Sequence, residues 1–386
     1  MESNRLTEIV RDLLPGIRER AARAESERRL PEETRKAFLE TGLLRALQPA
    51  RFGGLEQDPL SFYEAVMEVG TACGSSAWVL GVVGVHNWQL ALFDERAQHD
   101  VWRDDPTVQI SSSYAPTGRV EPASGGFVLS GRWSFSSGCD HCDWVFLGGL
   151  VPLDDGVELR TFLLPRSDYL IDDNWHVMGL RGTGSKDIVV EEAFVPEHRT
   201  HSFGDAFVGK HPGSVVNPGP IYRLPFGCVF CSAIAAPAVG VARGAVEEVI
   251  RQAEGRISTI DGSSPAQDAT VVARLGEAGS EVEAAAAGIR RPWRAMSSLV
   301  GENQAIPLSL RADCRSSVVH AVEWSVRATL RVFQVAGSRA IFDDNPLQRA
   351  LRDVIAIRAH AMNHLEKSGS LRAKQTLGSL GGEQFL

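Results

Sequence analysis

The chain has 386 residues, of which 44% are hydrophobic and 23% are charged, and its formal net charge at pH 7 is −8. This composition is that of an ordinary globular protein, and the length exceeds that of one ordinary domain. The negative charge argues against nucleic-acid and anionic-membrane partners, because both need a basic protein surface.

The beginning of the chain lacks the cationic flank and apolar core of a signal peptide. Two apolar windows, residues 76–93 and 226–242, are too short or too polar to span a bilayer, and the first contains His86, Asn87 and Gln89. We therefore expect a cytoplasmic protein with reduced cysteines. Two Cys-x-x-Cys pairs are present, but the gap between them is far longer than a zinc ribbon allows, so no metal site is expected.

The first third of the chain reads as helices only, because apolar residues recur at helical spacing and Pro31 and Asp58-Pro59 are helix-start signals. The fourth of these helices is apolar nearly all round and should be buried. We expect helices over residues 3–29, 31–42, 59–74, from Ser75 or Ser76 onward, and 95–102.

From Pro106 to about Phe203 the hydrophobic period is two, which is typical of strands. No helix-length pattern separates these strands, so the sheet should be mainly antiparallel. After a loop over residues 204–222, four long amphipathic segments predict a helical bundle. These segments cover residues 225–255, 269–299, 306–337 and 344–366.

The sequence thus predicts an α+β, mainly α protein with three domains. They are an N-terminal helical domain (1–105), a β domain (106–205) and a C-terminal four-helix bundle (206–386).

Residues 136–141, SSGCDH, lie where one strand crosses to the next, between two tryptophans. A hairpin loop with hydroxyl–backbone bonds and a ligand-binding loop both fit this pattern. Two further polar, aromatic stretches, VGVHNW (83–88) and ISSSYAP (110–116), favour the ligand loop. No GxGxxG motif follows a strand and GxSxG is absent, so neither a Rossmann nucleotide site nor a serine hydrolase is expected.

The order of helices, β domain and bundle resembles the acyl-CoA dehydrogenase superfamily, and residues 334–353 look like its C-terminal pattern. The stretch that carries the catalytic carboxylate in several dehydrogenases is RAHAMNHLE here, with His360 instead, which argues against acyl-CoA oxidation. VGVHNW, ISSSYAP, SSGCDH and GLRGTGS (179–185) instead resemble the two-component flavin-dependent monooxygenases. Within that family the resemblance is to the group of 4-hydroxyphenylacetate and 3-hydroxy-9,10-secosteroid hydroxylases.

This resemblance implies an oxygenase component that ortho-hydroxylates a phenolic aromatic substrate with O2 and reduced FMN, FADH2 being possible, through a C4a-hydroperoxyflavin. It also implies a separate NAD(P)H:flavin reductase and a homotetramer. An N- or S-oxygenating monooxygenase of the same fold, an acyl-CoA dehydrogenase-like flavoenzyme and a fold-only flavin binder remain alternatives. The pair His86–Ser112 favours the phenol hydroxylase over the first of these.

On the same resemblance, His86 is the general base for the phenol, since imidazole titrates near neutrality. Ser112 would hold the phenolic oxygen beside it, and Asn87 and Tyr114 could line the same pocket. From the residues alone, His86 reads as a packed core histidine and Ser112 as an ordinary strand serine.

The resemblance also assigns the flavin contacts. Ser137 would serve flavin N5 in any protonation state, because a hydroxyl can donate and accept. His360 would hydrogen-bond the peroxide oxygens, Arg256 would reach the flavin from a neighbouring subunit, and the backbone of the 182–184 turn would approach the ring. The cofactor-binding residues expected are Trp133, Phe135, Ser136, Ser137, Gly182, Thr183, Arg256, Gln334, Gly337 and Ser338.

Overall fold

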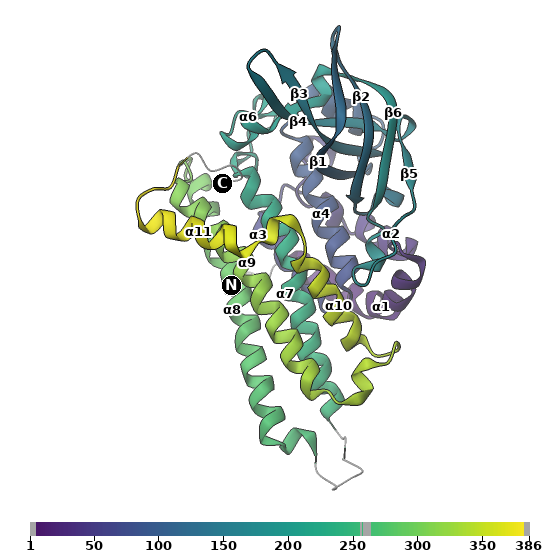
Figure 1. The fold of residues 1–386 in the computed structure, drawn as a ribbon, viewed down its shortest axis with the longest axis vertical. Coiled ribbons are helices and arrows are strands. Elements are labelled where there is room, and N and C mark those ends of the chain that lie inside the picture. Colours follow the sequence, from purple (N-terminus) through teal and green to yellow (C-terminus); the bar gives the residue numbers. More distant parts are fainter. Residues whose placement is uncertain (1–4, 255–256, 258–263, 382–386) are drawn as a thin grey trace.

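The computed structural model describes residues 5–254, 257 and 264–381 (Figure 1). The first part of the chain is helical, as its periodicity predicts. Its helices are α1 (Arg5–Glu27), α2 (Glu32–Glu40), α3 (Pro59–Gly70), α4 (Gly74–Leu90) and α5 (Glu95–Trp102). The predicted start signals are confirmed, since Pro31 precedes α2 and the Asp58 side chain accepts a hydrogen bond from Leu60 N at the start of α3.

The central region forms one sheet. Its strands are β1 (Ile110–Ala123), β2 (Gly126–Ser136), β3 (Trp144–Leu153), β4 (Gly156–Pro165), β5 (Leu170–Asp172), β6 (Lys186–Pro196) and β7 (Thr200–Ser202). Their order in the sheet is β5-β6-β2-β1-β3-β4-β7. Among the described residues every neighbouring pair is antiparallel except β1 and β3, which confirms a mainly antiparallel sheet.

The crossing from β2 to β3 is not a hairpin, because β1 lies between these two strands. β1 pairs with β3 through Ile110–Ser113 and, after a register shift, at Gly118, and it pairs with β2 through Arg119–Ala123. The SSGCDH segment therefore passes the start of β1 before it enters β3. The hairpin interpretation is wrong, since hydrophobic alternation identifies strands but not their neighbours.

The C-terminal part is a helical bundle that extends away from the sheet (Figure 1). The short helix α6 (Phe203–Phe207) lies beside the sheet, and the helices after it are α7 (Phe226–Ala253), α8 (Ala269–Gly301), α9 (Leu308–Val335), α10 (Pro346–Arg358) and α11 (Leu365–Thr376). The helix predicted over 344–366 ends early, and the segment predicted as a loop contains α6. At the end of α10 the His360 ring accepts a hydrogen bond from Met362 N at 3.1 Å, so a separate short turn begins there.

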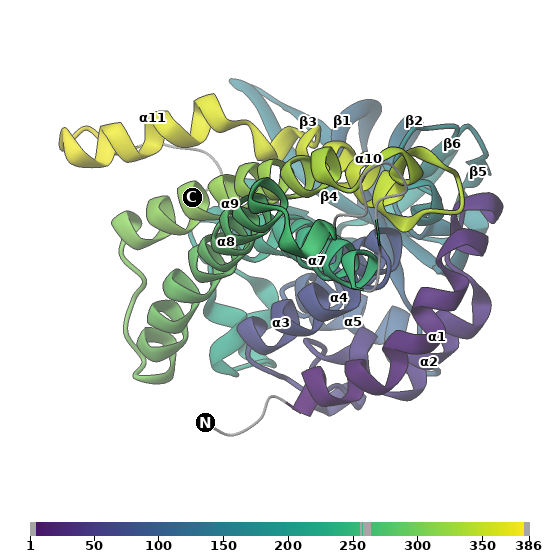
Figure 2. The same ribbon diagram turned by 90° about the horizontal axis from the view of Figure 1, so that it is seen from below.

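The helices before and after the sheet share one hydrophobic core, and Figure 2 shows α3 and α4 beside α7. The sheet has its own core around Trp133, whose indole N–H donates to Gly148 O. Helix α4 lies between the two parts, and all its residues except Val82 are buried. Helix α7 is long and apolar enough to cross a membrane, but 83% of its apolar window is buried, as in the core helix of a soluble protein.

Helices α3 and α7 approach each other through glycines. A Cβ atom at Gly240 would stand 2.1 Å from Met67 O, whereas a Cβ at Gly276 of α8 would meet nothing within 4 Å. We expect Gly240→Ala to lower the free energy of unfolding by ~1–3 kcal/mol through overpacking. Gly276→Ala should raise it by ~0.5–1 kcal/mol, because alanine favours a helix. Thermal melts of both variants check this, and equal shifts of Tm would contradict the packing described.

Candidate active site

The structure brings His86 of α4 and Ser112 of β1 together. His86 Nδ1 lies 2.6 Å from Ile110 O, and His86 Nε2 lies 2.8 Å from Ser112 Oγ. A carbonyl only accepts, so Nδ1 carries the proton and Nε2 accepts the hydroxyl proton of Ser112. His86 is buried and Ser112 is half-buried, so the serine oxygen is the accessible end of the pair.

Aromatic rings surround this pair. The His86 ring centroid lies 6.2 Å from Tyr114, 5.9 Å from Phe146 and 6.0 Å from Phe230. Phe203 packs edge-on against Tyr114, which extends the wall toward α6. Such a lining suits an aromatic ligand, because rings pack well face to edge.

Two polar neighbours of His86 on α4 differ in direction. Asn87 donates to Leu44 O and to Gln109 Oε1, so both of its amide hydrogens are used away from Tyr114. Gln89 accepts the Tyr114 hydroxyl, and within the described residues its own amide nitrogen has no partner. Gln89 is a site residue that the motifs missed, although its place one turn after His86 could have pointed to it.

Burial sets the protonation of His86. It lowers the pKa of His86 from its usual 6.5 to about 4, and the Ile110 carbonyl opposes this only in part. The expected titration near neutrality is therefore wrong. The imidazole is neutral at pH 7, so its Nε2 lone pair can accept the hydroxyl proton of Ser112.

A second cluster of polar groups joins Ser137 to α4 and to the segment after α10. Trp78 Nε1 donates to Ser137 Oγ at 2.9 Å, and the Trp78 ring lies 5.7 Å from the His360 ring. Because His360 Nδ1 accepts from Met362 N, its Nε2 carries the proton and can donate. Burial, with help from Arg315, lowers the pKa of His360 and keeps it neutral. Trp78 was missed, although it lies two helical turns before His86 on the same helix.

The GLRGTGS segment packs directly on the SSGCDH segment. Gly138 N donates to Thr183 O at 2.8 Å, and the Ser185 hydroxyl lies 2.7 Å from Ser137 Oγ and 2.6 Å from Thr183 Oγ1. A Cβ atom at Gly182 would stand 2.9 Å from the Ala24 side chain of α1. Packing on α1 thus already requires a glycine here.

The end of β2 presents an exposed aromatic side chain. Phe135 has a φ of 71° and is 70% exposed, with its ring 6.0 Å from that of Trp175. A non-glycine residue at positive φ is strained, and such strain gathers at functional sites. Beside it, Ser136 Oγ is buried and has no partner within the described residues. Trp133, by contrast, is fully buried in the core of the sheet.

The remaining predicted residues lie elsewhere. Gln334, Gly337 and Ser338 are exposed at the turn between α9 and α10, at the end of the bundle away from the sheet (Figure 1). One chain does not bring them to Ser137. Arg256 falls outside the described residues.

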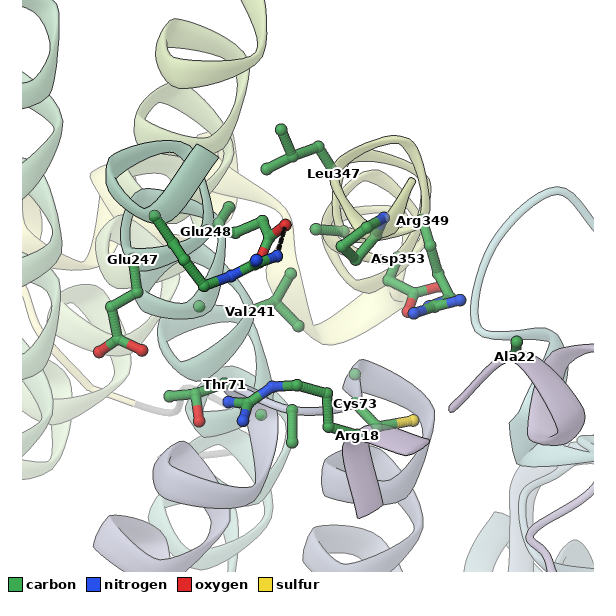
Figure 3. Close-up of a pocket in the computed structure, with 18 of the residues that line it drawn as sticks. Arg18, Ala22, Thr71, Cys73, Val241, Glu247, Glu248, Leu347, Arg349 and Asp353 are labelled. Carbon is green, nitrogen blue, oxygen red and sulfur yellow. Dashed lines mark hydrogen bonds and ion pairs between the residues drawn. The ribbon is translucent and has the colours of Figure 1, made fainter. Parts of the chain in front are cut away.

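A separate cavity of about 540 Å³ lies between α1, the α3–α4 turn, α7 and α10, and none of the predicted site residues lines it (Figure 3). Asp353 forms part of its wall and also accepts a hydrogen bond from Leu180 N at 2.6 Å. This carboxylate therefore ties α10 to the GLRGTGS segment.

The residues around Ser137 fit a flavin ring. A flat apolar group would cover the exposed Phe135, and a polar edge would meet Ser137 and the unpartnered hydroxyl of Ser136. The acyl-CoA dehydrogenase N-terminal domain family matches residues 2–103, and the acyl-CoA dehydrogenase C-terminal domain family matches residues 232–364. Fold and site thus define a flavoprotein with the acyl-CoA dehydrogenase fold.

Similar proteins narrow this class. The chain is 42% identical to the flavin-dependent monooxygenase oxygenase subunit HsaA of Rhodococcus jostii, over 92% of this chain and 94% of that protein. It is 31% identical to the oxygenase component of p-hydroxyphenylacetate 3-hydroxylase of Acinetobacter baumannii, over 97% and 89%. The crystal structure of HsaA from M. tuberculosis superposes with a TM-score of 0.95 at 40% identity, covering 99% of both chains.

The chain belongs to the family of oxygenase components of flavin-dependent aromatic monooxygenases. The leading interpretation of the sequence is confirmed at this level, and the term oxygenase component implies a separate reductase component.

The low pKa of His86 predicts a stability change in acid. Between pH 6.5 and about 4 the unfolded chain binds a proton at His86 that the folded chain excludes. Protonation of His86 therefore leaves the free energy of unfolding unchanged above pH 6.5 and lowers it as the pH falls through this range. From pH 7 to pH 5 the wild-type protein should lose roughly 2 kcal/mol more stability than His86→Asn. Urea unfolding at both pH values measures the difference. Equal losses in the two proteins would show that His86 is not held neutral by burial.

Proposed function

We propose that the protein hydroxylates a phenolic substrate ortho to its hydroxyl group, using O2 and reduced FMN, or FADH2, from a separate NAD(P)H:flavin reductase. The observation that carries the proposal is the 2.8 Å contact between His86 Nε2 and the half-buried Ser112 Oγ. A hydroxyl whose proton points at an imidazole turns its lone pairs outward, where they can accept a phenolic O–H. Relatives whose names specify p-hydroxyphenylacetate and resorcinol, both phenols, support this reading.

His86 is the general base in this proposal. When bound, reduced flavin supplies the activation of O2. As the phenol ring gives electron density to the oxygen atom that is added to it, the proton of the phenolic hydroxyl becomes more acidic. That proton can pass to Ser112 Oγ while the Ser112 proton passes to His86 Nε2. The Ile110 carbonyl favours the charged imidazole that results. Tyr114 lines the substrate wall, whereas Asn87 is left out because its amide hydrogens are bonded elsewhere.

Ser137 and His360 mark the flavin end of the same site. Ser137 Oγ would hydrogen-bond flavin N5, and Phe135, Ser136 and the backbone of Gly182 would border the ring. The Nε2–H of His360 is free of its own turn and can donate to an oxygen bound above the ring. Both residues contact Trp78 of α4, the helix that also carries His86, so one buried helix aligns flavin and phenol.

The phosphate of the flavin needs a second chain in this proposal. Gln334, Gly337 and Ser338 are exposed at the α9–α10 turn, next to Ile341 and Phe342, which are 68% and 50% exposed. An exposed apolar pair beside turn amides suits a subunit interface that holds a neighbour's phosphate. We infer a cytoplasmic homotetramer with flavin sites shared between subunits, to which Arg256 also contributes.

Incubation with reduced FMN, ¹⁸O2 and a panel of phenols tests the function. Mass spectrometry should find one ¹⁸O atom added ortho to the phenolic hydroxyl. His86→Asn and Ser112→Ala should each lower the rate ~10²–10⁴-fold, the usual worth of general-base catalysis. His198→Asn is the matched control, because His198 pairs with Asp100 away from this pocket. Unchanged rates in both site variants would remove the pair from the mechanism.

His360→Val separates the flavin end from the phenol end. Loss of this donor should raise the H2O2 released per molecule of hydroxylated product, while the variant still binds the phenol. A coupled peroxide assay measures that ratio, and a wild-type ratio would assign His360 to packing alone.

A further inference from the structure

A line of three hydroxyl groups connects Ser137 to a backbone carbonyl. Ser137 Oγ lies 2.7 Å from Ser185 Oγ, which lies 2.6 Å from Thr183 Oγ1, and Thr183 Oγ1 lies 2.8 Å from Leu180 O. All three hydroxyl side chains are buried. These separations are those of O–H···O hydrogen bonds.

The direction of each bond follows from a count of protons. Every one of the three oxygen–oxygen contacts needs one proton, and the three hydroxyls supply one each. The Leu180 carbonyl can only accept, so Thr183 donates to it. Ser185 must then donate to Thr183, and Ser137 must donate to Ser185. No hydroxyl proton is left over.

Ser137 therefore has no proton to offer a ligand. One of its lone pairs accepts the indole N–H of Trp78 at 2.9 Å, and the other remains. In this arrangement Ser137 can accept a hydrogen bond from flavin N5–H but cannot donate one to N5, which limits the expectation that it serves N5 in any protonation state. Toward a ligand, the Ser137 hydroxyl can therefore only accept a hydrogen bond.

We propose that Ser185 and Thr183 make Ser137 select reduced flavin over oxidised flavin. The inference rests on the proposed function, in which Ser137 faces flavin N5. Reduced flavin carries a hydrogen on N5 and can donate it to the remaining lone pair of Ser137. Oxidised flavin has a lone pair at N5 and would meet an oxygen that cannot donate. Ser185 and Thr183 are positioning residues, because they act through Ser137.

This selectivity suits an oxygenase component that receives its flavin from another protein. The reduced ring gains a hydrogen bond on arrival. Oxidised flavin would lack that bond, so Ser137 would hold it less tightly and the site would be open to the next reduced flavin.

Variants that free a proton in the chain test the proposal. Ser185→Ala removes the acceptor of the Ser137 proton, and Thr183→Val leaves the Ser185–Ser137 contact with one proton to spare. Each should tighten oxidised FMN and lower the ratio of the oxidised to the reduced Kd about tenfold, the effect of one hydrogen bond. Ser185→Thr keeps the hydroxyl and should keep the ratio. Ser325→Ala is a control, because it removes a buried hydroxyl bonded within α9.

Fluorescence titrations with oxidised FMN in air and with photoreduced FMN under anaerobic conditions give both Kd values without any turnover. If the wild-type protein binds neither form of FMN or of FAD, the proposed function itself fails. If the wild-type protein binds both forms equally, the selectivity does not exist. If it prefers reduced flavin but Ser185→Ala and Thr183→Val keep its ratio, the proposed function stands and the hydroxyl chain does not set the selectivity.

Discussion

The burial of helix α4 is the constraint on which the rest of the structure depends. Almost every residue of this helix is buried, so partners on other elements stabilise its polar side chains. Trp78 finds Ser137, and His86 finds Ile110 O and Ser112. An unpaired buried polar group costs ~1–3 kcal/mol, so these bonds hold the sheet and its loops in one position on the helix. The proposed flavin and phenol ends of the site are aligned for the same reason.

The same burial shapes the chemistry that we propose. It keeps His86 and His360 neutral, so that one offers a lone pair and the other an N–H at neutral pH. Burial also excludes water from the site. An oxygenase needs this exclusion so that its reductant is used to oxidise substrate and is not lost as peroxide. The aromatic rings around His86 have two functions, because they exclude water and can pack against an aromatic substrate.

Much of this could be predicted from the sequence, for identifiable reasons. The period of apolar residues defines helices and strands, and the buried character of α4 follows from its apolar run. The pairing of His86 with Ser112 came from family resemblance, since periodicity alone cannot place a helix residue against a strand residue. The early end of α10 has no glycine or proline signal, because the His360 ring itself forms the turn. The direction of the Ser137 hydrogen bond depends on three hydroxyls meeting in space, which no local pattern encodes.

The alignment of flavin and phenol by α4 is tested most directly by a crystal structure of the protein with reduced FMN and a phenol bound under anaerobic conditions. We predict flavin N5 within hydrogen-bond distance of Ser137 Oγ and the phenolic oxygen on Ser112 Oγ beside His86. We also predict a phosphate held by Gln334, Gly337 or Ser338 of a second subunit. A flavin bound in the separate cavity beside Asp353, or a phenol away from Ser112, would show that α4 does not align both ligands.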